Sequence, residues 1–185
     1  MDDAAGEVGD KIARMLGGPV PGGKWLREFA EKGTPNEDLI SIRSAHAVLP
    51  PFCFSFSGIK SQVANYVDKY RQQRKDTTQD NQDNQNNSEA AIGIPDHLKS
   101  DIAYKLFQEI DESLTKQLIG AGRKYAAATI GLCGGVSANP KLRERIQQRR
   151  DVELPDAAYW SPAEFVYCTD NAAMIGVAGL IMYTY

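Results

Sequence analysis

The fold of this chain is decided by the stretch Thr129-Ile-Gly-Leu-Cys-Gly-Gly-Val-Ser-Ala-Asn139. Its first residues have the apolar character of a strand, and Gly134 and Gly135 then predict a turn where the backbone can approach a ligand with no Cβ in the way. Asn139 and Pro140 suit the N-cap and the first position of a helix, whose free N–H groups favour phosphate. The stretch therefore predicts a strand, a glycine turn and a helix of the nucleotide-binding kind. A plain turn with no ligand would have the same local sequence.

Helical and strand-like patterns alternate along the rest of the chain, and this alternation favours an α/β layered domain. Small residues in the last helix, Gly176 and Gly179 among them, predict close packing there. The predicted elements are helices over 4–16, 25–29, 59–70 and 102–118, after residue 139 and from about 171, and strands over 52–57, 126–133 and 152–154.

One segment, Arg71–Glu89, contains no apolar residue and is rich in Asn, Gln and Asp. Such a segment cannot bury enough surface to offset the entropy of ordering it. We therefore predict that residues 71–89 form a disordered insertion within one domain.

The overall composition excludes several classes of protein. The 185 residues suit one domain or one lobe, and a net charge of −3 shows no basic surplus for nucleic acid, although a local patch could still contact it. No apolar stretch is long enough to span a membrane, and the acidic start does not resemble a signal peptide. Cys53, Cys133 and Cys168 are odd in number and far apart, which favours buried free thiols in a reducing compartment.

Further blocks of the sequence point to a known family. The glycine stretch, followed by Leu142-Arg143, stands with Cys168-Thr-Asp-Asn-Ala-Ala-Met-Ile175, Phe54-Ser-Phe-Ser-Gly-Ile-Lys60 and the opening segment from Asp2 to Gly23. In this order the blocks closely resemble the TsaD family, which makes threonylcarbamoyladenosine in tRNA and was once described as an O-sialoglycoprotein endopeptidase. The resemblance covers nearly the whole chain.

The resemblance implies both a fold and a reaction. The implied fold is α/β, the second lobe of the actin/Hsp70-like ATPase (RNase H-like) fold, with a mixed sheet flanked by helices over residues 1–185. The implied reaction transfers a threonylcarbamoyl group from threonylcarbamoyl-AMP to the adenosine beside the anticodon. Its partners would be tRNA, that adduct or an ATP-like nucleotide, and either a second copy or other subunits of the modification complex.

The resemblance also assigns substrate contacts. Asp10, Gly23 and Asn139 match family positions that contact the adenylate, and Gly134 and Gly135 would cradle it. Each has a plainer alternative: a solvated helix residue for Asp10, plain turns for the glycines, and a simple helix cap for Asn139.

Asp170 matches the family aspartate that binds a divalent metal, iron or zinc, together with two histidines of a His-x-x-x-His pair. That pair is absent from this sequence, and His46 and His97 lie in no matching motif, so we expect neither to be a ligand. The family's first lobe, which carries the pair, precedes the block where this chain begins. From sequence alone, Asp170 could equally be the aspartate at a helix N-terminus.

Two other interpretations stay open on the sequence. The chain could be a non-catalytic scaffold or interaction module of the same fold, because it lacks two metal ligands and is expected to be inactive alone. A sugar or acetate kinase of the same superfold shares the glycine loop but does not explain the Cys168–Ile175 block. A basic stripe after the glycine turn is expected to be a solvated helix face, and the compartment to be mitochondrial or cytoplasmic. The stripe consists of Arg143, Arg145, Arg149 and Arg150.

Overall fold

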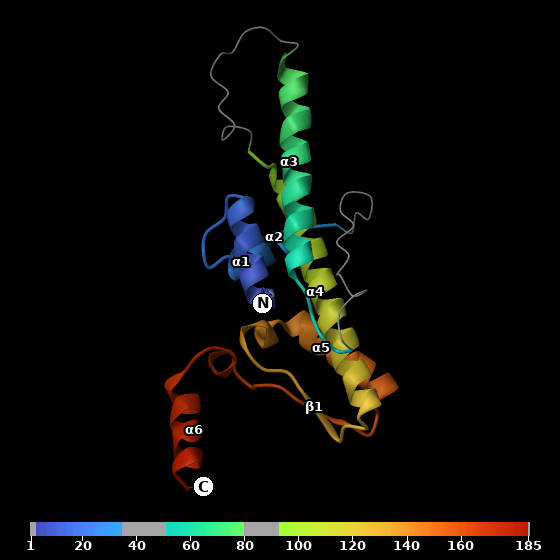
Figure 1. Cartoon of the computed structure of the whole chain (residues 1–185), viewed down its shortest axis with the longest axis vertical. Coiled ribbons are helices and arrows are strands. Elements are labelled where there is room, and N and C mark those ends of the chain that lie inside the picture. The colour runs from blue at the N-terminus through green and yellow to red at the C-terminus, as the bar shows by residue number, and fades with distance from the viewer. Residues whose placement is uncertain (1–2, 35–50, 80–92, 185) are drawn as a thin grey trace. The chain divides into compact units, whose positions relative to one another are not determined.

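A computed structural model describes residues 3–34, 51–79 and 93–184 (Figure 1). The chain forms two compact units, Met1–Ser113 and Leu114–Tyr185, which are described separately. The elements are α1 (Ala5–Met15), α2 (Gly23–Ala30), α3 (Ser57–Gln79), α4 (Asp96–Lys124), β1 (Thr129–Gly131), the 3-10 helix η2 (Gly135–Ala138), α5 (Pro140–Glu153), β2 (Ala158–Trp160), the 3-10 helix η3 (Phe165–Cys168) and α6 (Ala172–Thr184).

The first unit is helical, and α1 packs against α2 and α3. Val8 and Ile12 are fully buried, one turn apart on the same face of α1. Helix α1 ends within one residue of the predicted bound at 16, and Gly17 just beyond it has a φ of 84°, a left-handed conformation that suits glycine. The N–H of Gly18 donates to the carbonyl of Ala13 at 2.7 Å, which closes the last turn.

Contacts between α2 and α4 extend this core. The N–H of Thr34, just after α2, donates to Asp101 Oδ1 of α4 at 2.9 Å. The guanidinium of Arg27 lies over the ring of Phe107, 5.7 Å from its centre. Leu106 of α4 is fully buried, so the amino-terminal part of this long helix is a wall of the first unit.

The predicted strand over 52–57 is wrong. Phe52 has a positive φ of 64°, the residues after it have no regular structure, and α3 begins at Ser57. Phe56 is buried and its carbonyl accepts the N–H of Ile59 at 3.1 Å, which starts the helix. The alternation of phenylalanines therefore reflects one ring in the core and Phe54 stacked on it, with ring centres 5.9 Å apart.

The predicted disorder is also wrong for residues 71–79, because α3 continues to Gln79. Helix α3 is already anchored by the buried Ile59, Val63 and Val67, and adding a residue to an existing helix needs no new nucleus. Residues 80–92 lie outside the described part, so disorder there stays a prediction.

The second unit contains a parallel strand–helix–strand unit. Strands β1 and β2 pair in parallel with Thr129 opposite Ala158 and Gly131 opposite Trp160, and α5 connects them. The α/β class is therefore confirmed, with a two-stranded parallel sheet in the described residues. The predicted strand over 152–154 is wrong, because α5 continues to Glu153 and the second strand comes later.

The core of the second unit lies between this sheet, α5 and the end of α4. Ile119, Ile130, Leu142 and Ile146 are buried together. A Cβ at Gly122 of α4 would lie 2.7 Å from Leu154 Cδ1, so glycine lets the helix approach closely. At about 1.5–3 kcal/mol for each large apolar side chain, these contacts are the main stabilisation of the small sheet.

Helix α6 forms where it was predicted but does not pack as predicted. None of its residues is buried, and Figure 1 shows it apart from the sheet of its own unit. Its side chains are apolar on all sides, a composition typical of helices that are enclosed in a larger protein. No described helix is long and apolar enough to cross a membrane.

We predict an acid-sensitive link between the start of the chain and α3. Lys11 donates to Asp3 at 2.6 Å and Lys60 of α3 lies 3.5 Å from Asp3, and the hydrogen bond from Lys11 lowers the pKa of Asp3 below its ordinary 3.8. The link should therefore stabilise the fold at neutral pH and be lost as pH falls through the lowered pKa. Asp3→Asn should lower the Tm at pH 7.

The difference between Asp3→Asn and the parent should shrink below pH 3.8 and vanish once Asp3 of the parent is protonated, as measured by thermal unfolding followed by circular dichroism. The control is Asp68→Asn, a change at an exposed position of α3. A Tm difference for Asp3→Asn that is independent of pH would contradict this account.

Candidate functional site at the carboxyl edge of the parallel pair

The glycine loop begins directly after the first strand of the parallel pair. Gly134 has φ 82° and ψ 173°, a backbone conformation that is essentially restricted to glycine. The carbonyl of Gly134 then accepts the N–H of Ser137 at 2.9 Å, which forms η2. Space for a ligand is left at Gly135, where a Cβ would meet no atom within 4 Å.

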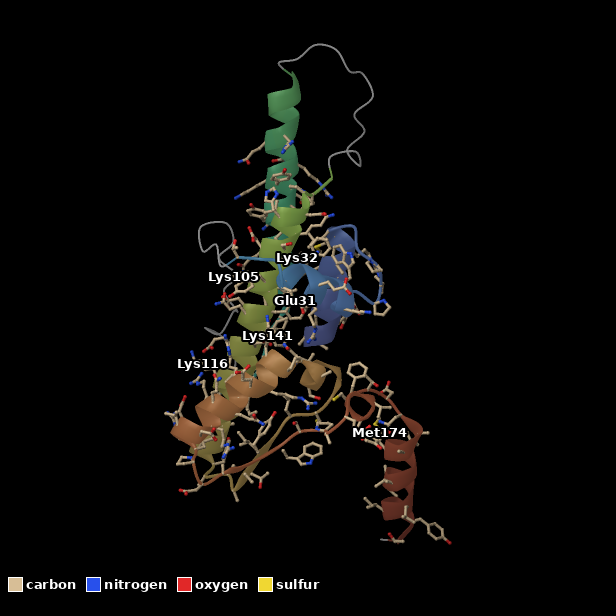
Figure 2. All side chains as sticks on the ribbon, turned by 180° about the vertical axis from the view of Figure 1, so that it is seen from behind. Glu31, Lys32, Lys105, Lys116, Lys141 and Met174 are labelled. Atoms are coloured by element: carbon tan, nitrogen blue, oxygen red, sulfur yellow. The ribbon has the colours of Figure 1, made fainter. Side chains whose placement is uncertain are left out.

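Asn139 caps α5, as predicted. Its side-chain oxygen accepts the N–H of Lys141 at 3.1 Å, and Pro140 occupies the first helical position. Figure 2 shows Lys141 at this start of α5. Asn139 is buried, so its side chain is held by the cap, and a substrate contact for it stays a prediction.

Arg143, one turn into α5, connects two segments that are distant in sequence. Its Nε donates to the carbonyl of Ser137 in η2, and its Nη2 donates to Cys168 Sγ in η3 at 3.1 Å. Both acceptor residues are buried. Arg143 therefore does not belong to a solvated basic stripe, whereas Arg149 pairs with Glu153 of its own helix as a surface residue would.

Asp170 does not cap α6. That role belongs to Asn171, whose side-chain oxygen accepts the N–H of Met174 at 2.9 Å and whose amide donates to the carbonyl of Thr169 at 2.9 Å. Figure 2 shows Met174 at the start of α6. Asp170 is exposed, and it has no hydrogen bond or ion pair with any residue that the structure describes. The cap interpretation of Asp170 is thus removed.

Parallel pairing brings the glycine loop and the Asp170 segment to one edge. Because β1 and β2 run in the same direction, the segments that leave their carboxyl ends start side by side. One segment carries Gly134 and Gly135, and the other leads through η3 to Asp170. The two segments also contact each other beyond the strands, where η2 packs against η3.

The described residues do not by themselves hold a metal. No group of three or more His, Cys, Asp or Glu side chains placed to bind an ion occurs among them. His97 is exposed at the start of α4 in the first unit, and His46 lies outside the described residues. Asp170 therefore offers a single carboxylate, and a divalent ion needs further ligands from elsewhere.

In the first unit, the structure brings Asp10 to the turn that precedes Gly23. The Asp10 carboxylate accepts the N–H of Gly22 at 2.7 Å. A Cβ at Gly22 would lie 2.1 Å from the Cβ of Ala13, whereas one at Gly23 would meet nothing within 4 Å. Asp10 thus holds the turn against α1 and leaves Gly23 open, and the adenylate contacts expected of both residues stay predictions.

The cysteines follow the prediction in part. All three are free, and Cys168 is buried as expected. Cys53 and Cys133 are exposed, so the expectation of buried thiols is wrong for them. Both lie in irregular segments between elements, where an apolar neighbourhood in the sequence does not imply burial.

Sequence patterns missed the two residues that organise this site, Arg143 and Asn171. Arginine on a polar helix is ordinarily solvated, and only the fold shows that Arg143 faces η2 and η3. Asn171 could have been found, because asparagine directly before an apolar helical run is a strong N-cap signal.

The site thus belongs to an α/β domain with a glycine loop and an acidic segment at one edge of a parallel sheet. The family model of TsaD, tRNA N6-adenosine threonylcarbamoyltransferase, matches residues 1–177, and the chain belongs to this family. A relative with that name from Moorella thermoacetica is 36% identical over 183 residues, which are 98% of this chain and 46% of the relative. Relatives of the same name from Listeria welshimeri and Geobacillus thermodenitrificans are 35% and 34% identical and are covered to the same extent. The chain spans about half the length of the curated relatives it matches.

We predict that the two glycines of the loop differ in role. Gly134→Ala should cost about 1–3 kcal/mol of unfolding free energy, because alanine is strained at this backbone conformation. Gly135→Ala meets no neighbour, so stability should change little, and the added methyl group should weaken AMP binding on the expectation that this loop cradles the adenylate. Chemical denaturation and titration calorimetry measure the two effects. If Gly135→Ala bound AMP as the parent does, the open space above Gly135 would have no role in nucleotide binding.

Proposed function

We propose that this chain is part of a tRNA N6-adenosine threonylcarbamoyltransferase. The reaction would transfer a threonylcarbamoyl group from threonylcarbamoyl-AMP to the exocyclic amine of the adenosine beside the anticodon. The amine nitrogen forms the new bond to the carbamoyl carbon, AMP leaves with the electrons of the broken bond, and the amine loses a proton. One observation carries the proposal: within a family match over residues 1–177, the loop at the end of β1 is open above Gly135.

The contribution of the glycine loop would be to hold the adenylate. An open glycine in the loop that leads into α5 allows backbone N–H groups to approach an anionic group closely. Holding the adduct in a single orientation would let proximity of the amine and the carbonyl supply much of the rate. For Asp10 and Gly23, adenylate contacts are proposed only on the resemblance of their positions to family positions.

The fold proposed for the whole chain is the second lobe of an actin/Hsp70-like ATPase. The strand–helix–strand unit and the coverage of 46% of the Moorella relative support this assignment. We further propose that the chain alone does not catalyse the transfer. The apolar helix α6, in which no residue is buried, supports this, because such a helix is ordinarily enclosed by further protein.

Asp170 is proposed to be one ligand of a divalent metal, iron or zinc, with the other ligands supplied from outside the described residues. Two observations support the assignment. Asn171, and not Asp170, caps α6, and Asp170 is exposed on the segment that leaves the same sheet edge as the glycine loop. A carboxylate is a suitable ligand for either ion in the company of imidazoles.

We predict that Asp170→Asn will distinguish the proposed transferase function from a non-catalytic scaffold role. The test protein joins this chain to the portion of the Moorella relative that lies outside the match. Asp170→Asn should remove both bound metal, measured by elemental analysis, and tRNA modification, measured by nucleoside mass spectrometry. Its Tm should change little, because Asn171 makes the helix cap.

Asp156→Asn is the matched control, because Asp156 is an exposed aspartate of the same unit, and it should retain both metal and activity. Normal metal content and modification in Asp170→Asn would overturn the ligand assignment. A fusion that folds and binds metal but modifies no tRNA would instead favour the scaffold interpretation.

A further inference from the structure

The guanidinium of Arg143 is hydrogen-bonded to buried groups, unlike that of a typical surface arginine. Arg143 is half-buried in the first turn of α5, and its backbone N–H continues the helix by donating to the carbonyl of Asn139 at 3.2 Å. Its guanidinium is directed away from that helix to two acceptors, the Ser137 carbonyl and the Cys168 thiol. The first acceptor is six residues away in sequence and the second is twenty-five.

The two acceptors belong to the two segments that form the candidate site. Ser137 is fully buried in η2, which begins at the open Gly135. Cys168 is 2% exposed at the end of η3, two residues before Asp170, and its thiol also contacts the carbonyl of Glu164 at 3.6 Å. No backbone hydrogen bond between η2 and η3 appears among the described residues, so the guanidinium supplies the polar connection between them.

We propose that Arg143 is the positioning residue of this site. Its guanidinium fastens the glycine loop to the η3 turn and thereby fixes the segment that carries Asp170 relative to the loop. This inference rests on the proposed function only in assigning a nucleotide to the loop. Arg143 acts through Ser137 and Cys168 and does not itself contact a substrate.

Arginine is required for this role because of its geometry. The planar guanidinium presents Nε and Nη2 as separate donors in a rigid fork, so it can bond two acceptors on different segments at once. Lysine keeps the charge, but its three N–H donors share one nitrogen on a flexible stem, so it lacks the rigid fork that reaches both acceptors. Arg143→Lys therefore removes the rigid two-nitrogen connection while it preserves the charge.

The test uses the 185-residue chain with Cys53→Ser and Cys133→Ser, so that Cys168 is the remaining thiol. The rate of Cys168 alkylation by iodoacetamide is measured in this parent, in Arg143→Lys and in Arg149→Lys, with and without AMP. Arg149→Lys is the matched control, because Arg149 lies on the same helix and pairs with Glu153 at 2.7 Å. The Tm of each variant and its affinity for AMP are measured in parallel.

We expect Arg143→Lys to be alkylated at least several-fold faster than the parent, with a Tm close to that of Arg149→Lys. Bound AMP should slow alkylation of the parent and of the control, because the loop and the η3 turn move together. In Arg143→Lys, AMP should still bind but should no longer protect Cys168. A residue that only stabilised the fold would lower the Tm and leave the protection by AMP intact.

Equal alkylation rates in the parent and in Arg143→Lys would overturn the proposal, and so would AMP protection that survives the substitution. If no variant binds AMP, the nucleotide role of the loop fails. The comparison without AMP then still decides whether Arg143 connects the two segments.

Discussion

Parallel pairing of two three-residue strands is the constraint on which the site depends. Parallel strands cannot be joined by a tight turn, so a helix must return the chain to the starting edge, and α5 does so. The carboxyl ends of β1 and β2 then lie together. The candidate functional segments of the second unit both start from this edge. They are the glycine loop after β1 and the Asp170 segment after β2.

Such a short sheet cannot be stable through its own hydrogen bonds. It is held by Ile130 of β1, packed against Leu142 and Ile146 of α5 and against Ile119 of α4. Leu142 and Ile146 are one helical turn apart, and Arg143 lies directly beside Leu142 in the sequence. Core packing of α5 therefore also sets the direction of Arg143, so that burial of apolar residues and the arrangement of the site have the same cause.

Much of this arrangement follows from the sequence where a local signal agrees with the fold. Asn139 and Pro140 mark the start of α5, and Gly17 marks the end of α1, because caps depend on a few neighbouring residues. Strand β2 was missed because three residues carry no periodicity, and their pairing with β1 is a long-range event. The alternation at Phe52–Ser57 misled for the same reason, since no partner strand pairs with it among the described residues.

The site itself was predicted as separate residues and not as an arrangement. Gly134 and Gly135 were identified by the pattern of strand, glycine turn and helix, and Asp170 by its resemblance to a family position, whereas Arg143 was assigned to a solvated helix face. The three-dimensional structure shows that Asn171 has the cap and that Arg143 joins the loop to the η3 turn. The Asn171 cap is local and had a sequence signal, whereas the hydrogen bonds of Arg143 join segments that are distant in sequence and leave no periodic signal.

The most direct test of the central claim, that the glycine loop and the segment before α6 form one site, is a nuclear magnetic resonance titration of the chain with AMP. The account predicts the largest amide shifts at Gly134 and Gly135, together with a second set over residues 168–171, and both sets should follow one binding curve. Shifts at the loop that leave residues 168–171 unchanged, or no shifts at the loop at all, would contradict it.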